Sequence, residues 1–106
     1  MNEKMVTDHN FHSEVIASDI PVCVCFSASW CRPCKEMAPV VKELAEELKG
    51  KAKIVKMNVE DNFATTGEFG IMSVPTFLIF VKGSVKEQMN GVLTKATLKE
   101  KIEKYL

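Results

Sequence analysis

Apolar residues recur along the chain at two different spacings, and their alternation predicts strands and helices in turn. Residues 20–26 form a nearly continuous apolar run, which is typical of a strand buried on both faces inside a mostly parallel sheet. From Cys34 to Leu48, apolar residues recur at spacings of four, three and four, and this predicts an amphipathic helix with one face on the core. Pro39 lies inside that pattern and predicts a kink, because proline removes a helical donor and crowds the preceding turn.

Shorter patterns predict the remaining strands and helices. Gly83 lies between two apolar runs, so the flanking strands should form an antiparallel hairpin. Thr94 is the expected N-cap of a last helix. In chain order we expect a helix before Asp19, the strand over 20–26, the long helix, a strand over 54–59, a weak helix over 62–70, strands over 76–81 and 85–89, and the helix after Thr94. This order predicts a single α/β domain over residues 1–106 with a mixed sheet.

Composition and charge narrow the class of protein. The chain has 106 residues, of which 46% are hydrophobic and 26% charged, as in ordinary globular domains. Fourteen basic residues balance fourteen acidic ones, which argues against binding to nucleic acid or to an anionic membrane. The longest unbroken apolar run, 77–81, is too short to span a bilayer. Residues 1–8 lack the apolar stretch of a secretory signal, so we expect a cytoplasmic protein, and we expect it to be monomeric.

All four cysteines fall within one short stretch of the chain, at Cys23, Cys25, Cys31 and Cys34. A secreted scaffold spreads its cysteines so that disulfides close long loops, whereas bridges here would close only short ones. The clustering therefore favours a reducing compartment, with cysteines that are reduced, reactive or metal-bound.

The segment Trp30-Cys31-Arg32-Pro33-Cys34-Lys35 carries the candidate chemistry, because it lies between the buried strand and the long helix. A spacing of i and i+3 brings the two sulfurs close enough for a disulfide. Cys31 would lie at the helix N-terminus, where free amide donors and the helix dipole stabilise a thiolate. Cys34, one turn further, should be more buried and less acidic. This asymmetry suits dithiol chemistry, with an exposed attacking thiol and a shielded resolving thiol.

These residues resemble the active-site signature of the thioredoxin family, with arginine in place of the usual glycine between Cys31 and Pro33. The resemblance covers roughly residues 5–106. It continues, in chain order, through Pro39, Lys56 and Asn58, Phe69-Gly70-Ile71, Val74-Pro75-Thr76, Gly83 and Gly91. It implies the thioredoxin fold, a central mixed sheet with helices on both faces. It also implies a protein-disulfide reductase in which Cys31 attacks and Cys34 resolves, without a bound cofactor or metal.

The same resemblance implies partners and a docking surface. The partners would be proteins with disulfides, and a reductase that returns electrons to the Cys31–Cys34 pair. The bond before Pro75 would be cis and packed against the cysteines, where Pro75 keeps metal from the thiols and leaves the Val74 backbone able to pair with an extended substrate. The surface would comprise Trp30, Pro33, Met72, Ser73, Val74, Gly91 and Val92, although core or turn packing is an alternative for Met72 and for the last four.

Two positions beneath the motif depart from the family pattern. Cys25 stands where the family usually carries a buried aspartate, and Ser27 stands where it often carries tryptophan. That acid is thought to accept the proton of the resolving thiol. A thiol among apolar neighbours should stay protonated, so Cys25 is a poor replacement. We expect water or Lys56 to carry the Cys34 proton instead.

Arg32 is the only arginine in the chain and is the third departure. A cation beside Cys31 favours the thiolate and therefore the dithiol form, so the disulfide should be somewhat more oxidising than with glycine. Pro33 and Pro75 are the other residues expected to tune the redox pair. Arg32 can also meet acidic substrates, or it can simply be a tolerated exposed residue.

Other functions stay open at this point. Four close cysteines could hold zinc or an iron–sulfur cluster, although metal sites usually pair two short cysteine knuckles. The scaffold could serve as a binding module without catalysis, and among redox enzymes an isomerase or oxidase is the alternative to a reductase. Cys23 and Cys25 share one strand face and are expected to be inert core residues. A regulatory thiol pair or a bridge between Cys25 and Cys34 are the alternatives.

Overall fold

The computed structural model describes residues 4–106, and its centre is a five-stranded mixed sheet in the order β1-β3-β2-β4-β5. Strand β1 is parallel to β3 and β3 is parallel to β2, whereas β4 is antiparallel to both β2 and β5. The strands are β1 (Lys4–Met5), β2 (Val22–Ser27), β3 (Lys53–Asn58), β4 (Thr76–Val81) and β5 (Ser84–Asn90).

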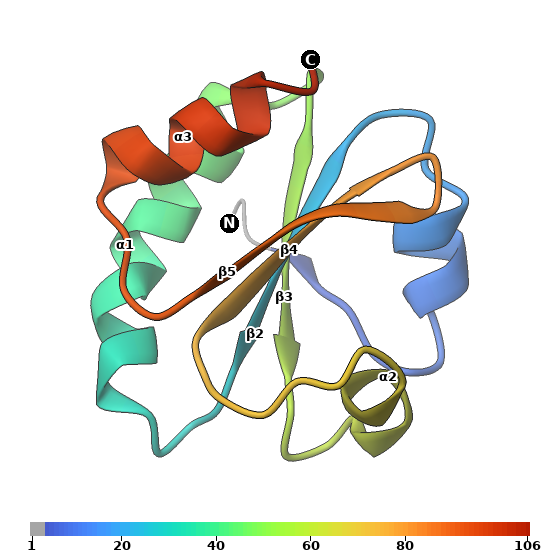
Figure 1. Ribbon diagram of the computed structural model, residues 1–106, viewed down its shortest axis with the longest axis vertical. Coiled ribbons are helices and arrows are strands. Elements are labelled where there is room, and N and C mark those ends of the chain that lie inside the picture. Colours follow the sequence, from blue (N-terminus) through green and yellow to red (C-terminus); the bar gives the residue numbers. More distant parts are fainter. Residues whose placement is uncertain (1–3) are drawn as a thin grey trace.

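Helices cover both faces of this sheet, as Figure 1 shows. On one face lie α1 (Arg32–Glu47) and α3 (Lys95–Glu103), and on the other lie η1 (His12–Ile16) and α2 (Phe63–Glu68). The thioredoxin-type mixed sheet with helices on both faces is therefore confirmed.

Two hydrophobic cores fill the spaces between the sheet and its helices, because alternate residues of a buried strand face opposite sides. The core under α1 and α3 includes Met37, Val41 and Leu44 from the long helix and Leu98 and Ile102 from the last one. The core under η1 and α2 is built around a cluster of three aromatic rings, from Phe11, Phe69 and Phe80. The periodicity predicted the α1 face correctly, since its apolar stripe is the buried one.

The structure corrects the predicted elements in two places. The pattern missed β1, because a strand of two exposed residues leaves no alternation to detect. The first helix has π geometry and covers only five residues. Helix α1 begins at Arg32, directly after the predicted cap Cys31, and continues through Pro39. The predicted hairpin is confirmed, and its turn places Lys82 and Gly83 at positive φ, which suits a two-residue turn between antiparallel strands.

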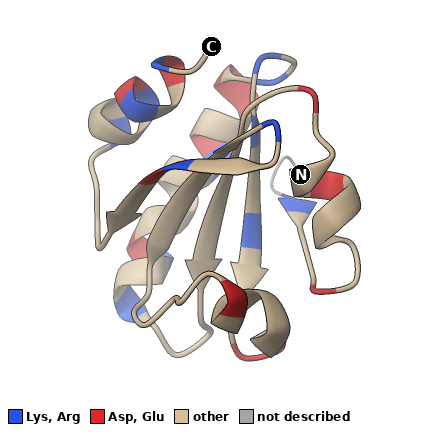
Figure 2. Ribbon diagram, turned by 45° about the vertical axis from the view of Figure 1, so that its right-hand side comes forward, with Lys and Arg blue, Asp and Glu red and all other residues tan. Residues whose placement is uncertain are grey.

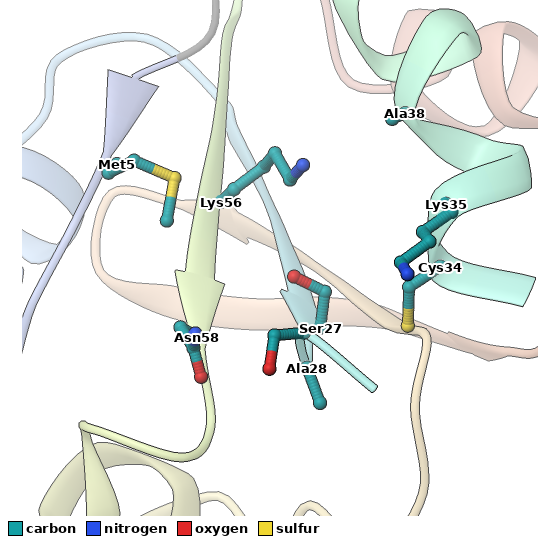
Figure 3. A pocket seen from close by; sticks show the side chains of 9 residues that line it. Met5, Ser27, Ala28, Cys34, Lys35, Ala38, Lys56 and Asn58 are labelled. Carbon is teal, nitrogen blue, oxygen red and sulfur yellow. The ribbon is translucent and has the colours of Figure 1, made fainter. Parts of the chain in front are cut away.

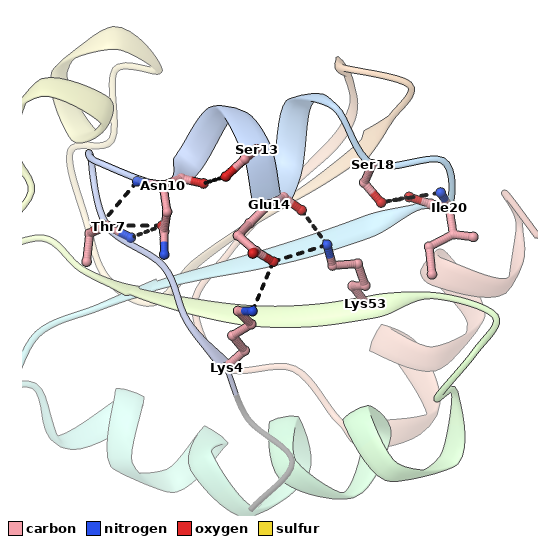
Figure 4. A network of polar contacts seen from close by, with 8 residues as sticks. All are labelled: Lys4, Thr7, Asn10, Ser13, Glu14, Ser18, Ile20 and Lys53. Atoms are coloured by element: carbon pink, nitrogen blue, oxygen red, sulfur yellow. Dashed lines mark hydrogen bonds and ion pairs between the residues drawn. The ribbon is translucent and has the colours of Figure 1, made fainter.

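A network of polar contacts attaches the first helix to the sheet (Figure 4). The Glu14 carboxylate accepts from Lys4 of β1 and Lys53 of β3, at 3.2 and 3.4 Å. Lys53 Nζ also donates to the Glu14 backbone carbonyl at 2.6 Å. The hydrogen bond and charge of Lys4 hold the pKa of Glu14 below its usual range, with Lys53 adding to the effect. These contacts fix β1 at the edge of the sheet.

Charged residues of both signs are mixed along α1 and α3, as the interleaved colours in Figure 2 show. Between α1 and α3, Glu47 pairs with both Lys95 and Lys99. Within residues 4–106, no helix has the length and apolarity needed to cross a bilayer.

Candidate active site

The two cysteines of the motif meet at the N-terminus of α1. Cys31 is the N-cap in extended geometry, Pro33 lies in the first turn, and the Cys34 amide donates to Cys31 Sγ at 3.2 Å. The structure joins Cys31 and Cys34 in a disulfide with a Cα–Cα distance of 5.3 Å. The predicted pairing and N-cap position are therefore confirmed. The amide donors and dipole of the helix end lie against the Cys31 sulfur, where they stabilise a thiolate once the disulfide opens.

The predicted difference in exposure between the two cysteines is wrong for this oxidised state. Cys31 is 3% exposed and Cys34 is 6% exposed, so both are buried and Cys34 is not the more shielded of the two. The reason is the loop before β4, because Cys31 Sγ lies 3.7 Å from the Val74 carbonyl oxygen. Spacing along a helix cannot reveal this cover, since it comes from a segment 43 residues away.

The loop over Cys31 has the predicted cis bond between Val74 and Pro75. It is held by hydrogen bonds on both sides of the proline. Thr76 Oγ1 donates to the Ser73 carbonyl at 2.7 Å, and the Gly91 amide donates to the Pro75 carbonyl at 2.8 Å. Gly91 has a φ of +89°, a conformation that favours glycine, so this residue brings the end of β5 against the loop.

The residues expected to dock substrates lie around this loop. Trp30, Met72 and Val92 are 70%, 95% and 53% exposed, although side chains of this size and polarity are usually buried. A cavity of about 130 Å³ brings Trp30 together with the 72–74 segment. The alternative of core packing is therefore wrong for Met72 and Val92.

Sequence reasoning missed several residues of this cavity. Val59, Thr66 and Ile71 complete its wall. Within the described chain, the Thr66 hydroxyl is buried without a hydrogen-bond partner. No local pattern marks these positions, because the residue after β3, helix α2 and the following loop meet only through the tertiary fold.

A second hollow, of about 230 Å³, lies beside Cys34 and is hereafter the Cys34 groove (Figure 3). It opens where β2 and β3 end and α1 begins. Its lining residues are Met5, Ser27, Ala28, Ser29, Cys34, Lys35, Ala38, Lys56 and Asn58. Figure 3 shows Lys56 extending from β3 toward α1, with Lys35 extending from α1 toward Cys34.

Glu60 holds the loop that precedes the motif. Its carboxylate accepts from the Ser29 amide at 2.7 Å, two residues before Cys31. Hydrogen bonds from Ser29 hold the pKa of Glu60 below its usual range. No local pattern marks this contact, because the two residues are 31 positions apart.

Cys23 and Cys25 lie in the core under α1, on the strand face predicted for them. They are 1% and 2% exposed, so the prediction of core packing is confirmed. Burial raises the pKa of the Cys23 thiol well above its usual range, and the neighbouring Cys25 adds to that shift. Cys25 pairs in register with Lys56 of β3 and Phe77 of β4, so it lies beneath the Cys34 groove without lining it.

Metal binding finds no support in the described part of the chain. Among residues 4–106, no group of three or more histidine, cysteine or acidic side chains could hold an ion.

The fold and this site define a class of protein: a thiol-disulfide oxidoreductase that carries its redox pair at a helix N-terminus opposite a cis proline. The thioredoxin family model matches residues 2–104. The chain is 48% identical to thioredoxin of Haemophilus influenzae and 45% identical to thioredoxin 1 of Nostoc, each over 101 residues, 95% of this chain and 94% of the relative. The chain belongs to the thioredoxin family.

A third relative extends beyond the shared domain. The chain is 46% identical over 102 residues to chloroplastic thioredoxin M-type of Brassica napus, which covers 96% of this chain and 58% of that protein. Together with the Cys31–Cys34 disulfide, these matches establish the chain as a thiol-disulfide oxidoreductase that reduces protein disulfides. Thioredoxins use their own dithiol for this chemistry and need no external cofactor.

Proposed function

We propose that Cys31 is the attacking thiolate and Cys34 the resolving thiol of a protein-disulfide reductase. The observation that carries this assignment is the N-cap position of Cys31, whose sulfur accepts the Cys34 amide. A hydrogen bond and a helix dipole at that sulfur favour its thiolate at neutral pH. Cys31 attacks one sulfur of the substrate disulfide, and the other substrate sulfur leaves as a thiolate. Cys34 then attacks Cys31 Sγ, which closes the disulfide and releases the second substrate thiol.

Substrates dock along the Pro75 loop in this proposal. An extended segment pairs with the Val74 backbone, which lies directly beside the Cys31 sulfur. Trp30, Met72 and Val92 offer exposed apolar contact area around it, with Ser73 and Gly91 in the adjoining backbone. Exposed Arg32 adds a positive charge next to Cys31 and favours substrates with acidic residues near their disulfide.

The proton of Cys34 leaves through the Cys34 groove, since Cys25 replaces the family's acid. The groove is open to solvent at the side of α1, and Lys56 extends into it. Burial disfavours thiolates, so a thiol buried as deeply as Cys25 already carries its proton and cannot take up the proton of Cys34. Water in the groove, with Lys56 as a relay, therefore replaces a fixed carboxylate.

The oxidised pair is returned to the dithiol by a separate reductase, and we place the cycle in the cytoplasm as a monomer. A reductase of this kind works where the surrounding thiol pool is reducing. An isomerase or oxidase role is the alternative, and a reduction potential measured against glutathione separates them. A potential of about −270 mV supports the reductase, and one of about −120 mV supports the oxidase.

A Cys34→Ser variant tests the assignment directly. Without its resolving thiol, Cys31 should stay bound to its substrates as mixed disulfides, which can be isolated from a reducing cell lysate and identified by mass spectrometry. Cys31→Ser is the matched control and should trap far fewer partners. Equal trapping by the two variants, or no trapping by Cys34→Ser, would contradict the proposal. Cell fractionation of the tagged wild-type chain tests the location.

A further inference from the structure

The two sulfurs of the disulfide face different surroundings. Cys31 Sγ contacts the Val74 carbonyl beneath the docking surface, whereas Cys34 lines the Cys34 groove on the α1 side. Cys34 also keeps the larger exposed fraction, 6% against 3%. The resolving cysteine therefore has an opening of its own, separate from the surface where protein substrates dock.

The two charged side chains that line that opening are both lysines, whereas Glu60 bonds to the Ser29 amide without lining the groove. Lys35 and Lys56 both line the groove, with Lys56 extending from β3 toward α1 (Figure 3), and none of the described lining residues is acidic. Asn58, Ser27 and Ser29 add groups that can hydrogen-bond. Two ammonium groups in a partly enclosed hollow attract a small anion and raise its local concentration.

The size of the groove limits what can enter. A volume of about 230 Å³ accommodates a small molecule but not a folded protein segment. Ser27 and the alanines of the lining leave this space open, because their side chains are short. Only a small ligand can therefore combine contact with both lysines and contact with Cys34.

The geometry points to a second redox activity: the Cys34 groove binds small anionic thiols of the mercaptocarboxylate class, which reduce the disulfide by attacking Cys34. The thiolate of the ligand forms a bond with Cys34 Sγ, the Cys31–Cys34 bond breaks, and Cys31 leaves as a thiolate. A second molecule of the thiol attacks the ligand sulfur of this mixed disulfide. It releases Cys34 as a thiolate that takes a proton from water, so two ligand thiols become one ligand disulfide.

Attack at Cys34 has an energetic advantage over attack at Cys31. Exchange is faster when the leaving sulfur is the more acidic one. The leaving sulfur in this direction is Cys31, whose thiolate is stabilised by the Cys34 amide at 3.2 Å and by the end of α1. The carboxylate of the ligand meets Lys35 or Lys56 while its sulfur reaches Cys34.

This inference rests on the proposed function only in taking Cys31–Cys34 as the redox centre. Stopped-flow fluorescence of Trp30, the only tryptophan, can follow reduction of the oxidised protein. The probes are mercaptoacetate, neutral 2-mercaptoethanol and cationic cysteamine, with rates divided by thiolate concentration and corrected for thiol basicity. We expect mercaptoacetate to react about fivefold faster than 2-mercaptoethanol at low salt and cysteamine to be slowest, with the differences shrinking at high salt.

Variants test whether the lysines of the Cys34 groove cause the preference for mercaptoacetate. A Lys35→Gln and Lys56→Gln double variant should bring the mercaptoacetate to 2-mercaptoethanol rate ratio close to one, whereas Lys86→Gln, an exposed lysine on β5, should keep the wild-type ratio. Ser27→Trp should slow mercaptoacetate by filling the groove. The ratio is insensitive to loss of a proton relay, because both thiols need the same proton. A ratio that persists in the double variant overturns the proposal.

A second test identifies which cysteine forms the first mixed disulfide with the ligand. Oxidised protein treated with limiting mercaptoacetate, quenched in acid and analysed by tandem mass spectrometry should carry the adduct on Cys34. An adduct on Cys31 overturns the inference and leaves the proposed function intact. If insulin disulfides are not reduced by the pre-reduced protein, the proposed function fails independently of where this adduct lies.

Discussion

The chain contains two pairs of cysteines that differ in environment far more than in sequence position. Cys31 and Cys34 lie at the N-terminus of α1, with an amide hydrogen bond at the first sulfur. Cys23 and Cys25 lie in the middle of β2, within a hydrophobic core. Burial raises the pKa of Cys23, whereas the helix end favours a thiolate at Cys31. Identical side chains thus differ in how readily they form thiolates, because their surroundings set the cost of a negative charge.

The sharpest test of this comparison removes one cysteine from each pair. Cys31→Ser should lower the rate of insulin disulfide reduction by about a thousandfold or more, since a hydroxyl is not activated at this position as a thiolate is. Cys23→Ala is the matched control and should keep the wild-type rate, because Cys23 is buried in the α1 core. A comparable loss in both variants would show that the second pair takes part in turnover.

A second test replaces Cys25 with the acid that the family usually carries at this position. Cys25→Asp places a carboxylate beneath Cys34, and it should speed release of a mixed disulfide by about ten- to hundredfold if a fixed base accelerates resolution. Single-turnover kinetics of a preformed Cys31 mixed disulfide measures that step. A circular-dichroism melt is needed alongside, because moving a carboxyl from water into a buried position costs free energy of folding. An unchanged release rate in folded protein would mean that the acid does not matter in this chain.

The raised pKa of Cys23 predicts how stability depends on pH. In the unfolded chain this thiol ionises above about pH 8.5, but in the folded protein it stays protonated, so the unfolded state binds fewer protons. The free energy of unfolding should therefore fall as pH rises above that value, by up to about 1.4 kcal/mol per pH unit from this group. Urea denaturation of the oxidised protein between pH 8 and 10 measures the slope.

Cys23→Ala is the control for that slope. Removing the thiol should make the decline with pH shallower than in the wild type, even though the small cavity lowers stability at every pH. Parallel declines in the two proteins would assign the pH dependence to other groups.

The smallest effect concerns Arg32 beside the reactive pair. Arg32→Gly should lower the reduction potential by about 20 mV, because a favourable interaction of about 1 kcal/mol with the Cys31 thiolate is lost and the dithiol form is destabilised. Equilibration with a dithiol redox buffer gives the potential. Lys42→Gln removes one charge from an exposed position further along α1 and should leave it unchanged. A potential for Arg32→Gly equal to or above the wild type would refute the tuning role.

Local pattern and motif were sufficient for much of the fold and the redox pair. The α1 stripe, the hairpin at Gly83 and the N-cap at Thr94 all follow from interactions within a few residues, so the sequence reveals them. The motif placed Cys31 at the helix end by the same local logic. Strand β1 could not be predicted, since its two residues pair with β3 only after the chain has folded.

What the sequence by itself determined is the chemistry that is available: two cysteines at disulfide spacing at the start of a helix, and two more on one face of a buried strand. The tertiary structure decided how accessible that chemistry is. The Val74–Pro75 loop covers Cys31, Glu60 fixes the Ser29 loop, and the ends of β2, β3 and α1 leave a hollow beside Cys34. These contacts join residues far apart in the chain, and only the packed fold brings them together.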